Sequence, residues 1–399
     1  MSAIKHPCSA RKILLGITGG IAAYKAAELV RLLVKQSYDV QVVMTEAACQ
    51  FITPVTMQAL SGKPVLHNLW DNNVNNGMAH IDLSREADLV LIAPASADFI
   101  AKLAHGFAND LLSTLCLARN CPLMIAPAMN KQMWENPATQ RNIAQLTQDQ
   151  AGILLPDSGQ QACGEIGTGR MQEPESILAA VTAHFTPKIF ANNNILITAG
   201  ATIEMLDPVR GITNLSSGKM GYAIAQAAAN MGANVTLVSG KTEIPPPNNV
   251  RIISAPSAEN MYQSVMQHIL HQDIFISVAA VADYTPETPS EHKIKKNTAS
   301  LTLTLKKNKD ILAEVASLPN PPFCVGFAAE SENLIAYASQ KRLAKKIPLI
   351  VANLVQTSMG RDHAEISLID ETGVHTLAPA DKPMLATQIL EHVHQLQST

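Results

Sequence analysis

The chain has 399 residues, more than one typical domain contains, so we expect two domains, each with its own hydrophobic core. Although 47% of the residues are hydrophobic, no apolar run is long enough for a transmembrane helix, and the net charge of −3 provides no general attraction to nucleic acid. The six cysteines are scattered without a CxxC pair, which argues against a zinc framework or a disulfide scaffold and predicts a reducing, cytoplasmic compartment.

Apolar strands alternate with helical segments in the first half. A strand over residues 12–20 ends in glycines and leads into residues 21–35, where apolar side chains recur at helical spacing. Residues 40–44, 89–93 and 123–126 are continuous apolar runs, which is typical of parallel strands that are covered on both faces. The pattern therefore predicts a parallel sheet between layers of helices.

The same design restarts in the second half. Residues 184–194 are interpreted as a polar linker, and an apolar strand that ends in a glycine turn follows over residues 195–202. A helix is expected over residues 220–231, and further strands are expected at residues 234–238, 274–278, 323–327 and 349–352. The alternation predicts two Rossmann-like, doubly wound α/β domains, residues 1–188 and residues 189–399.

The loops at the carboxyl ends of the strands are the first candidates for a binding site, because ligands of doubly wound sheets bind there. Residues 16–21, GITGGI, lack the GxGxxG spacing of a dinucleotide fingerprint, although their glycines would let a phosphate approach backbone N–H groups. Glycine at such a turn serves packing as often as binding. Ser96 also has two interpretations, because its hydroxyl can contact a ligand or cap the next helix.

Three chemical groups lie in separate loops of the first half: the imidazole of His80, the amide of Asn130 and the thiol of Cys163. Asn130 lies in PAMNKQMW directly after an apolar strand, and Cys163 lies within the glycine-rich loop GQQACGEIGTGRM. Taken singly, a solvent-facing histidine, a turn asparagine and a buried thiol are the commoner interpretations. Together they indicate a site for redox or proton chemistry on a small carboxylate.

Five motifs of the first half resemble those of the flavin-dependent cysteine decarboxylases. They are GITGGIAAYK (16–25), AHI (79–81), PASA (94–97), PAMNxxMW (127–134) and QACGxxGxGRM (161–171). The second half resembles phosphopantothenate–cysteine ligase through AGAT (199–202), LDPVR (206–210) and NLSSGKMG (214–221). In this order, the two halves are similar to the bacterial bifunctional proteins of coenzyme A biosynthesis over nearly the whole chain.

For the first half, the resemblance implies FMN-dependent decarboxylation of 4′-phosphopantothenoylcysteine to 4′-phosphopantetheine. FMN oxidises the cysteine moiety to a thioaldehyde, carbon dioxide leaves, and the reduced flavin then reduces the ene-thiol. His80 would transfer a proton, Asn130 would donate a hydrogen bond to the substrate carboxylate without adding charge, and Cys163 would donate the last proton from a mobile lid. The residues implied to bind FMN are Gly19, Gly20, Ile21, Thr45, Ser96 and Ala97.

For the second half, the resemblance implies ligation of cysteine to 4′-phosphopantothenate. The carboxylate attacks the α-phosphate of CTP to give an acyl-cytidylate and pyrophosphate, and the cysteine amine then displaces CMP. Lys293 and Asn214 are the implied catalytic residues, and Mg²⁺ would bind through the CTP phosphates with unassigned protein ligands. The residues implied to bind CTP are Ser277, Val278, Ala279, Asp283, Lys293, Asn308, Lys309, Asp310, Ile311, Phe327, Lys341 and Lys345.

Six lysines are concentrated between residues 293 and 309 of the second half, and a ligase that uses a triphosphate needs such cations to neutralise phosphate charge. They are Lys293, Lys295, Lys296, Lys306, Lys307 and Lys309. A charge run is usually a solvated face, but no aromatic residue for base stacking lies among these lysines, so a triphosphate with Mg²⁺ fits better than a nucleic acid. Residues 211–219 are not a P-loop, because the glycine spacing differs and Met220 replaces the hydroxyl residue that would hold Mg²⁺.

Three positions depart from the ligase pattern: Ala201 replaces a second glycine, Gly211 replaces a bulky residue, and Lys309 replaces a proline. We expect them to alter affinity more than mechanism. The resemblance also implies a homo-oligomer, with decarboxylase trimers and ligase dimers that together allow a dodecamer, and neither a nucleic-acid nor a membrane partner.

Two alternatives come from other functional classes. A flavin-binding regulatory subunit is one, because relatives of the first domain include phosphatase inhibitors. A nicotinamide-dependent dehydrogenase is the other, because both halves are Rossmann-like. The absence of GxGxxG from both halves argues against the dehydrogenase.

Overall fold

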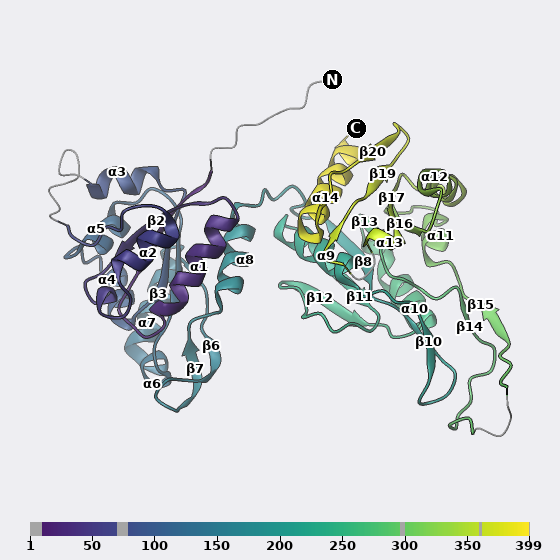
Figure 1. Cartoon of the computed structure of the whole chain (residues 1–399), viewed down its shortest axis with the longest axis horizontal. Helices are drawn as coiled ribbons and strands as arrows, with labels where there is room; N and C mark the ends of the chain where they lie inside the picture. The colour runs from purple at the N-terminus through teal and green to yellow at the C-terminus, as the bar shows by residue number, and fades with distance from the viewer. Residues whose placement is uncertain (1–9, 70–78, 296–299, 359–360, 399) are drawn as a thin grey trace. The chain divides into compact units, whose positions relative to one another are not determined.

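The computed structural model describes residues 10–69, 79–295, 300–358 and 361–398, without the side chains of residues 79, 80, 82, 357 and 358. The chain divides into two compact units, Met1–His184 and Phe185–Thr399 (Figure 1). Among the described residues, no helix is long and apolar enough to cross a membrane.

The first unit is built on a parallel sheet of five strands in the order β2-β1-β3-β4-β5. Their bounds are β1 Lys12–Ile17, β2 Asp39–Met44, β3 Leu89–Ala95, β4 Leu123–Pro127 and β5 Gly152–Ile153. Every residue of β3 is buried, as a central strand that is covered on both faces requires. The chain order reverses between β1 and β3, so a crevice opens at the carboxyl ends of these two strands.

Helices cover this sheet, and one small hairpin projects beyond it. Apolar side chains of α4, α5 and α7 form a core with residues of β1, β3 and β4 on one face. The hairpin of β6 and β7 follows β5. The bounds are α1 Ala23–Lys35, η1 Ala48–Gln50, α2 Pro54–Ser61, α3 Ala79–Glu86, α4 Ala97–His105, α5 Leu111–Ala118, α6 Lys131–Glu135, α7 Pro137–Gln148, β6 Asp157–Gln160, β7 Ile166–Arg170 and α8 Pro174–Phe185.

The second unit contains a sheet of eight strands in the order β12-β11-β8-β13-β16-β17-β19-β20. The first six strands are parallel, whereas β19 and β20 add an antiparallel edge that the sequence pattern did not predict. The bounds are β8 Asn194–Ala199, β11 Asn234–Ser239, β12 Val250–Ser254, β13 Ile274–Ser277, β16 Phe323–Glu330, β17 Leu349–Leu354, β19 Ser367–Ile369 and β20 Val374–Thr376. Here the order reverses between β8 and β13.

Two helical layers cover the second sheet. Helices α9 and α14 build the core on one face, and α10, α11 and α12 build it on the other. These helices are α9 Lys219–Asn230, α10 Ala258–His268, α11 Ile311–Ala316, α12 Leu334–Lys345 and α14 Lys382–Ser398. The smaller elements are β9 Ile203–Met205, β10 Gly211–Thr213, η3 Ile269–His271, β14 Tyr284–Pro286, β15 Leu305–Lys307, α13 Val355–Ser358, β18 His363–Ala364 and β21 Ala380–Asp381. The predicted fold class, two doubly wound α/β domains, is confirmed.

Candidate active sites

A cavity of about 480 Å³ lies at the reversal point of the first sheet. Its walls come from the turn after β1, the start of α4 after β3, the loop after β4, and the β6–β7 hairpin. Seven of the predicted site residues line it: Gly19, Gly20, Ile21, Ser96, Ala97, Asn130 and Cys163. The structure therefore brings together four segments that are far apart in the sequence.

A buried threonine ties the two central strand ends together. The Thr18 hydroxyl donates to the Pro94 carbonyl at 2.8 Å and accepts from the Ser96 backbone N–H at 2.8 Å. The Ser96 hydroxyl in turn accepts from the N–H of Phe99, so Ser96 caps α4 while it lines the cavity. The interpretation of Ser96 as a helix cap is confirmed, and its contact with a ligand stays a prediction. Thr18 was not identified as functional from the sequence, although it lies inside GITGGI.

Asn130 divides its amide between two tasks. Its Oδ1 accepts from the Met133 N–H at 2.9 Å and so caps α6. Its Nδ2 donates to the Glu165 carboxylate at 3.3 Å and to Gln132 at 3.3 Å. The helix cap uses only the side-chain oxygen of Asn130. Its amide N–H groups therefore remain available and are directed toward a carboxylate.

The thiol of Cys163 lies on the tip of the β6–β7 hairpin. Among the described cysteines it alone is exposed, whereas burial raises the pKa of Cys116 and of Cys324 to about 12. The Cys163 Sγ lies 3.6 Å from the Glu165 carboxylate, so Glu165 contacts both the thiol and the Asn130 amide. The interpretation of Cys163 as a buried thiol is wrong.

One glycine of this hairpin is required by close packing. Gly169 has a φ of +144°, and a Cβ added there would lie 2.4 Å from the Met129 carbonyl oxygen. The Met129 N–H also donates a hydrogen bond to the Gly169 carbonyl at 2.9 Å. The hairpin is therefore joined to the loop that carries Asn130.

Two cations at the cavity were not identified from the sequence. The Lys25 side chain is 8% exposed, and its ammonium donates to the Met171 carbonyl at 3.0 Å and to Glu173 at 2.7 Å. Arg170 donates to the Gln160 carbonyl at 3.3 Å. The only sequence signal for a buried Lys25 would have been its position within the apolar stripe of an amphipathic helix.

Thr45 and His80 are the two predicted residues of the first half that the structure does not place at this cavity. Thr45 follows β2, its hydroxyl accepts from the Ala48 N–H at 3.2 Å, and it is not among the cavity-lining residues. The backbone of His80 belongs to α3, but its side chain lies outside the described residues. The role of His80 therefore stays a prediction.

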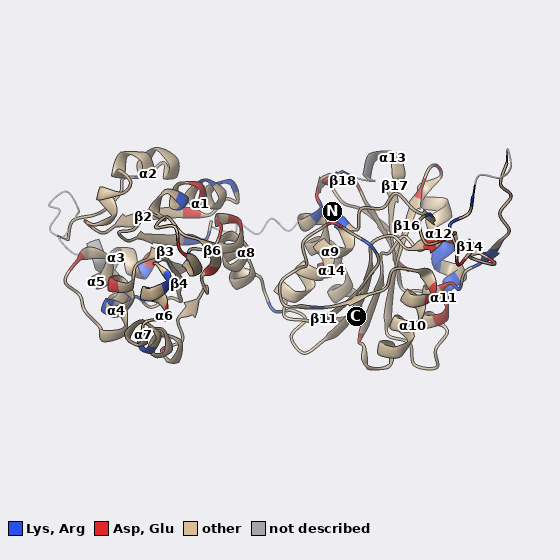
Figure 2. Ribbon diagram, turned by 90° about the horizontal axis from the view of Figure 1, so that it is seen from below, with Lys and Arg blue, Asp and Glu red and all other residues tan. Residues whose placement is uncertain are grey.

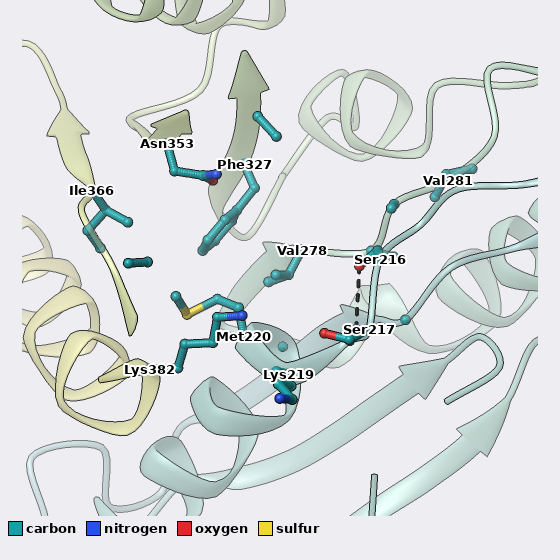
Figure 3. Close-up of a pocket in the computed structure, with 17 residues that line it drawn as sticks. Ser216, Ser217, Lys219, Met220, Val278, Val281, Phe327, Asn353, Ile366 and Lys382 are labelled. Carbon is teal, nitrogen blue, oxygen red and sulfur yellow. Dashed lines mark hydrogen bonds between the residues drawn. The ribbon is translucent and has the colours of Figure 1, made fainter. Parts of the chain in front are cut away.

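The second cavity, of about 260 Å³, lies at the reversal point of the second sheet (Figure 3). Gly200 after β8 and residues 278–281 after β13 form its floor, and Phe327 of β16 lies opposite. Of the residues predicted to bind CTP, Val278, Ala279 and Phe327 line this cavity. The loop before α9 and Asn353 of β17 complete the wall.

Positive charge and a helix N-terminus meet in this cavity. Gly218, with a φ of +78°, precedes α9, and a Cβ there would lie 3.2 Å from the Cα of Gly200. Lys382 reaches from α14 toward Met220, as Figure 3 shows. Burial, together with the nearby ammonium of Lys219, lowers the pKa of Lys382 below its usual value. The α9 N-terminus has no side-chain cap, and Lys219 is paired with Asp362 at 2.6 Å while Lys382 lies close to both. A helix N-terminus with lysines beside it suits a phosphate group.

Asn214 lies at the edge of this cavity. Its Nδ2 donates to the Ala280 carbonyl at 3.1 Å and to the Val281 carbonyl at 3.4 Å, and both partners line the cavity. The residue predicted to contact the acyl intermediate therefore lies beside the loop after β13. The polar residues Ser216, Ser217, Lys219 and Lys382 were not assigned from the sequence.

The remaining residues predicted to bind CTP lie outside the lining of this cavity, and two of them, Lys345 and Asp310, form an ion pair with each other. Asn308 donates to the Ala282 carbonyl at 2.8 Å, and Lys345 contacts both oxygens of Asp310 at 2.8 and 2.6 Å. Lys341 contacts Glu330 at 2.6 Å. Figure 2 shows the basic positions along β14–β15 and α12.

Three of the residues predicted to bind CTP, namely Ile311, Lys309 and Ser277, make their contacts elsewhere than at this cavity. The Ile311 side chain is 5% exposed and belongs to the core, so only its main chain is accessible to a ligand. The ammonium of Lys309 lies 3.9 Å from the centre of the Tyr262 ring and 3.6 Å from Glu259. Ser277 ends β13 just before the cavity-lining residues.

The segment that carries Lys293 is held by a buried carboxylate. Asp207 accepts from the Ile294 N–H at 3.1 Å and from Arg210 at 2.6 and 3.1 Å, while Arg210 also donates to the Ile294 carbonyl at 3.0 Å. The hydrogen bond from Arg210 is the main cause that holds the pKa of Asp207 well below its usual value. LDPVR thus fixes the backbone next to Lys293, whose side chain is exposed like that of Asp283.

The departures at Ala201 and Gly211 have structural accounts. Ala201 is buried and forms β-bridges with Lys241 and Ala280. A Cβ at Gly211 would lie 2.6 Å from the Ile203 side chain across the β9–β10 hairpin.

Both units carry a cavity at a reversal point of the strand order, which is where doubly wound α/β proteins bind their ligands. The model of the Flavoprotein family matches residues 1–186, and that of the DNA/pantothenate metabolism flavoprotein C-terminal domain matches residues 190–396. The chain belongs to the family of coenzyme A biosynthesis bifunctional proteins, which unite phosphopantothenoylcysteine synthetase and decarboxylase.

Individual relatives match nearly the full length of the chain. The "Coenzyme A biosynthesis bifunctional protein CoaBC" of Vibrio vulnificus is 51% identical over 393 residues, which cover 97% of this chain and 98% of that protein. The protein of the same name from Escherichia coli is 48% identical over 391 residues and 96% of either chain. A solved C-terminal domain of a CoaBC protein is 37% identical and covers 53% of this chain and 98% of that domain, with a TM-score of 0.47. The regulatory-subunit and dehydrogenase alternatives are therefore set aside.

Proposed function

We propose that the first unit binds FMN in its cavity and decarboxylates 4′-phosphopantothenoylcysteine there. The second unit is proposed to make this compound from 4′-phosphopantothenate, cysteine and CTP. FMN-binding sheets with the strand order 2-1-3-4-5 hold their cofactor at the same reversal point. The cavity volume lies within the range of ligand sites, and the turn after β1 offers backbone N–H groups. When bound, FMN supplies a two-electron oxidation of the cysteine moiety and the reverse reduction after carbon dioxide leaves.

The residues proposed to hold FMN are those that the resemblance implies: Gly19, Gly20, Ile21, Thr45, Ser96 and Ala97. The Thr18 hydroxyl fixes the two strand ends around this set. His80 is proposed to transfer the proton that accompanies the oxidation.

A single observation supports the substrate-binding role of Asn130: its amide already donates to a carboxylate, that of Glu165, at 3.3 Å. A substrate carboxylate that replaced Glu165 would gain the same hydrogen bond from a neutral group. A neutral donor holds the carboxylate without an ion pair that would oppose its departure as carbon dioxide. The exposed thiol of Cys163, 3.6 Å from the same carboxylate, is then close enough to donate the final proton.

In the second unit, the α9 N-terminus with Lys219 and Lys382 is proposed to hold a phosphate group of a substrate. Lys293 is proposed to stabilise charge on the α-phosphate of CTP, and Asn214 to contact the acyl-cytidylate. Mg²⁺ would bind through the CTP phosphates. The group of Asp283, Asn308, Lys309, Asp310, Ile311, Lys341 and Lys345 is proposed to bind the nucleotide, together with Ser277, Val278, Ala279 and Phe327.

Assembly and compartment are part of the same proposal. We propose a homo-oligomer in which decarboxylase trimers and ligase dimers combine. A catalytic thiol functions only in its reduced form, so we place the enzyme in the cytoplasm.

The test incubates the purified chain with 4′-phosphopantothenate, cysteine, CTP and Mg²⁺, and follows the products by mass spectrometry. We expect CMP, pyrophosphate, 4′-phosphopantothenoylcysteine and 4′-phosphopantetheine. Two fragments separate the activities, because each unit has its own core. Residues 1–187 should be yellow and only decarboxylate, and residues 188–399 should be colourless and only ligate. Products that appear only with other nucleotides, or a colourless first fragment, would contradict the proposal.

A further inference from the structure

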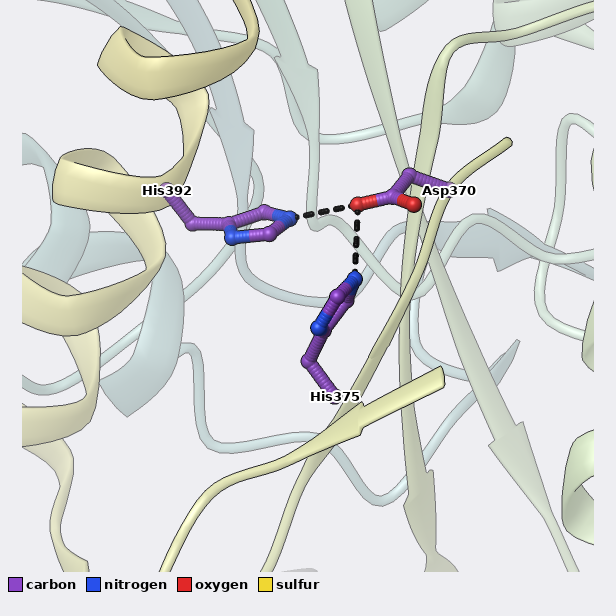
Figure 4. A group of neighbouring side chains, drawn as sticks. All are labelled: Asp370, His375 and His392. Atoms are coloured by element: carbon purple, nitrogen blue, oxygen red, sulfur yellow. Dashed lines mark hydrogen bonds and ion pairs between the residues drawn. The ribbon is translucent and has the colours of Figure 1, made fainter. Parts of the chain in front are cut away.

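A histidine–aspartate cluster lies in the second unit (Figure 4). Asp370 lies in the turn between β19 and β20, His375 lies on β20, and His392 lies on α14. The Asp370 Oδ2 is 2.7 Å from His392 Nε2 and 3.1 Å from His375 Nε2. None of the three residues lines either cavity. We propose that this cluster is a binding site for a divalent transition metal such as Zn²⁺.

The carboxylate is fixed by its second oxygen. Asp370 Oδ1 accepts from the Thr372 N–H at 2.7 Å, the Thr372 hydroxyl at 2.6 Å and the Gly373 N–H at 3.1 Å. The Asp370 side chain is 1% exposed. The carboxylate oxygen Oδ2 is thus held in place and directed at two imidazole nitrogens, as metal ligands are oriented by hydrogen bonds to their other atoms.

The donor set and its spacing fit a tetrahedral metal ion. Two imidazole nitrogens and one carboxylate oxygen with an open fourth position are a common zinc set. Metal–ligand bonds of 2.0–2.2 Å place tetrahedral ligand atoms about 3.3 Å apart. The three ligand atoms here lie within 4.8 Å of one another. His375 is 42% exposed and can rotate, so small side-chain movements would complete the geometry and leave a position for water.

A bound metal would join three segments. It would fix the last helix, α14, to the β19–β20 edge of the sheet, and α14 carries Lys382 at its other end. The site would therefore stabilise the ligase unit without entering its chemistry. A hydrogen-bond network alone is the competing explanation, and it predicts no affinity for Zn²⁺.

The test uses the full chain after treatment with a chelator, in the absence of nucleotide, and measures Zn²⁺ binding by calorimetry. His375→Gln and His392→Gln retain an amide that can donate to Asp370 but remove the metal-binding nitrogen. His394→Gln is the matched control, because His394 lies on the same helix and packs against Phe190 with ring centres 5.6 Å apart. Cys163→Ser removes the exposed thiol as a competing ligand.

We expect one Zn²⁺ per chain in the wild-type protein, His394→Gln and Cys163→Ser, and at least about a tenfold weaker affinity in His375→Gln and His392→Gln. At a hundredfold excess over Kd, Zn²⁺ should raise the Tm of the ligase unit by about 5–10 °C in the wild type and in the two control variants, and much less in His375→Gln and His392→Gln. Co²⁺ should give a visible d–d band without thiolate charge transfer. Absence of binding in the wild-type protein, or an affinity for Zn²⁺ in His375→Gln and His392→Gln equal to that of the wild type, would overturn the proposal.

Discussion

The substitution Asn130→Asp tests the carboxylate site directly, because it changes one amide to a charged oxygen pair with almost no change in shape. Asp and Asn are equivalent helix N-caps, so the hydrogen bond from the Met133 N–H should persist and α6 should stay intact. The change instead places a negative charge where Asn130 now donates to Glu165 at 3.3 Å. A substrate carboxylate at that position meets the same repulsion.

The size of the effect follows from this distance. Two unit charges 3.3 Å apart repel by about 1 kcal/mol in bulk water and by about 5 kcal/mol at the effective dielectric constant of a protein surface. These values correspond to an affinity loss of about tenfold to several thousandfold for a substrate with a carboxylate. A decarboxylated ligand has no such charge, so 4′-phosphopantetheine should bind Asn130→Asp nearly as well as the wild type.

The assay compares both ligands by calorimetry on the flavin-loaded protein, with flavin content read from its visible absorption. Asn136→Asp is the matched control, since Asn136 caps α7 through the Ala138 N–H at 2.9 Å and does not line the cavity. Asn136→Asp should bind both ligands like the wild type. If Asn130→Asp retains full affinity for the carboxylate ligand, loses both ligands equally, or loses flavin, the assignment of Asn130 to the substrate carboxylate is wrong.

Three further predictions address the other groups. Cys163→Ser should decarboxylate but stall, so that an ene-thiol accumulates while the flavin stays reduced; normal turnover to phosphopantetheine, followed by mass spectrometry, would rule out the thiol as the proton donor. Lys293→Gln should block pyrophosphate release, whereas Asn214→Asp should form the acyl-cytidylate and process it slowly; a shared point of failure would contradict their separate roles. Asp207 and Asp370 have pKa values below the ordinary 3.8, so the stability that they contribute is present above about pH 5 and is lost as the pH falls below 3.8 toward their folded pKa values. Urea unfolding between pH 3 and 6 should show this loss, and Asp370→Asn should reduce the slope.

Much of the fold was predictable because buried parallel strands have a clear sequence pattern. Buried on both faces, β3 and β8 appear as unbroken apolar runs, and their spacing leaves room for crossover helices. The antiparallel edge of β19 and β20 was missed for the opposite reason: β20 is exposed at all three residues, and each strand has only three residues. A short exposed strand carries too little pattern to separate it from a loop.

The residues that line the cavities were also identified only in part from the sequence. Glycines, asparagines and the loop cysteine were identifiable because turn residues between strands lie at the carboxyl edge of a sheet. Lys25 and Lys382 were not, since each is mostly buried, at 8% and 7% exposure, and lies on a helix where lysine usually faces solvent. Glu165 was missed because its partners, Asn130 and Cys163, come from different segments that only the folded chain joins.

The proposed functions of the two centres set different demands at the two ends of one compound. Ligation would convert the carboxylate of 4′-phosphopantothenate into an amide and leave the carboxylate of the incoming cysteine free. If Asn130 binds that carboxylate as proposed, a neutral donor is required, because a charged partner would stabilise the carboxylate that must leave. The phosphate at the other end of the compound is unchanged, and cations suit it in both units, namely Lys219 and Lys382 in one and Arg170 in the other. A decarboxylase unit that carried a lysine at position 130 should therefore bind its substrate more tightly and turn it over more slowly.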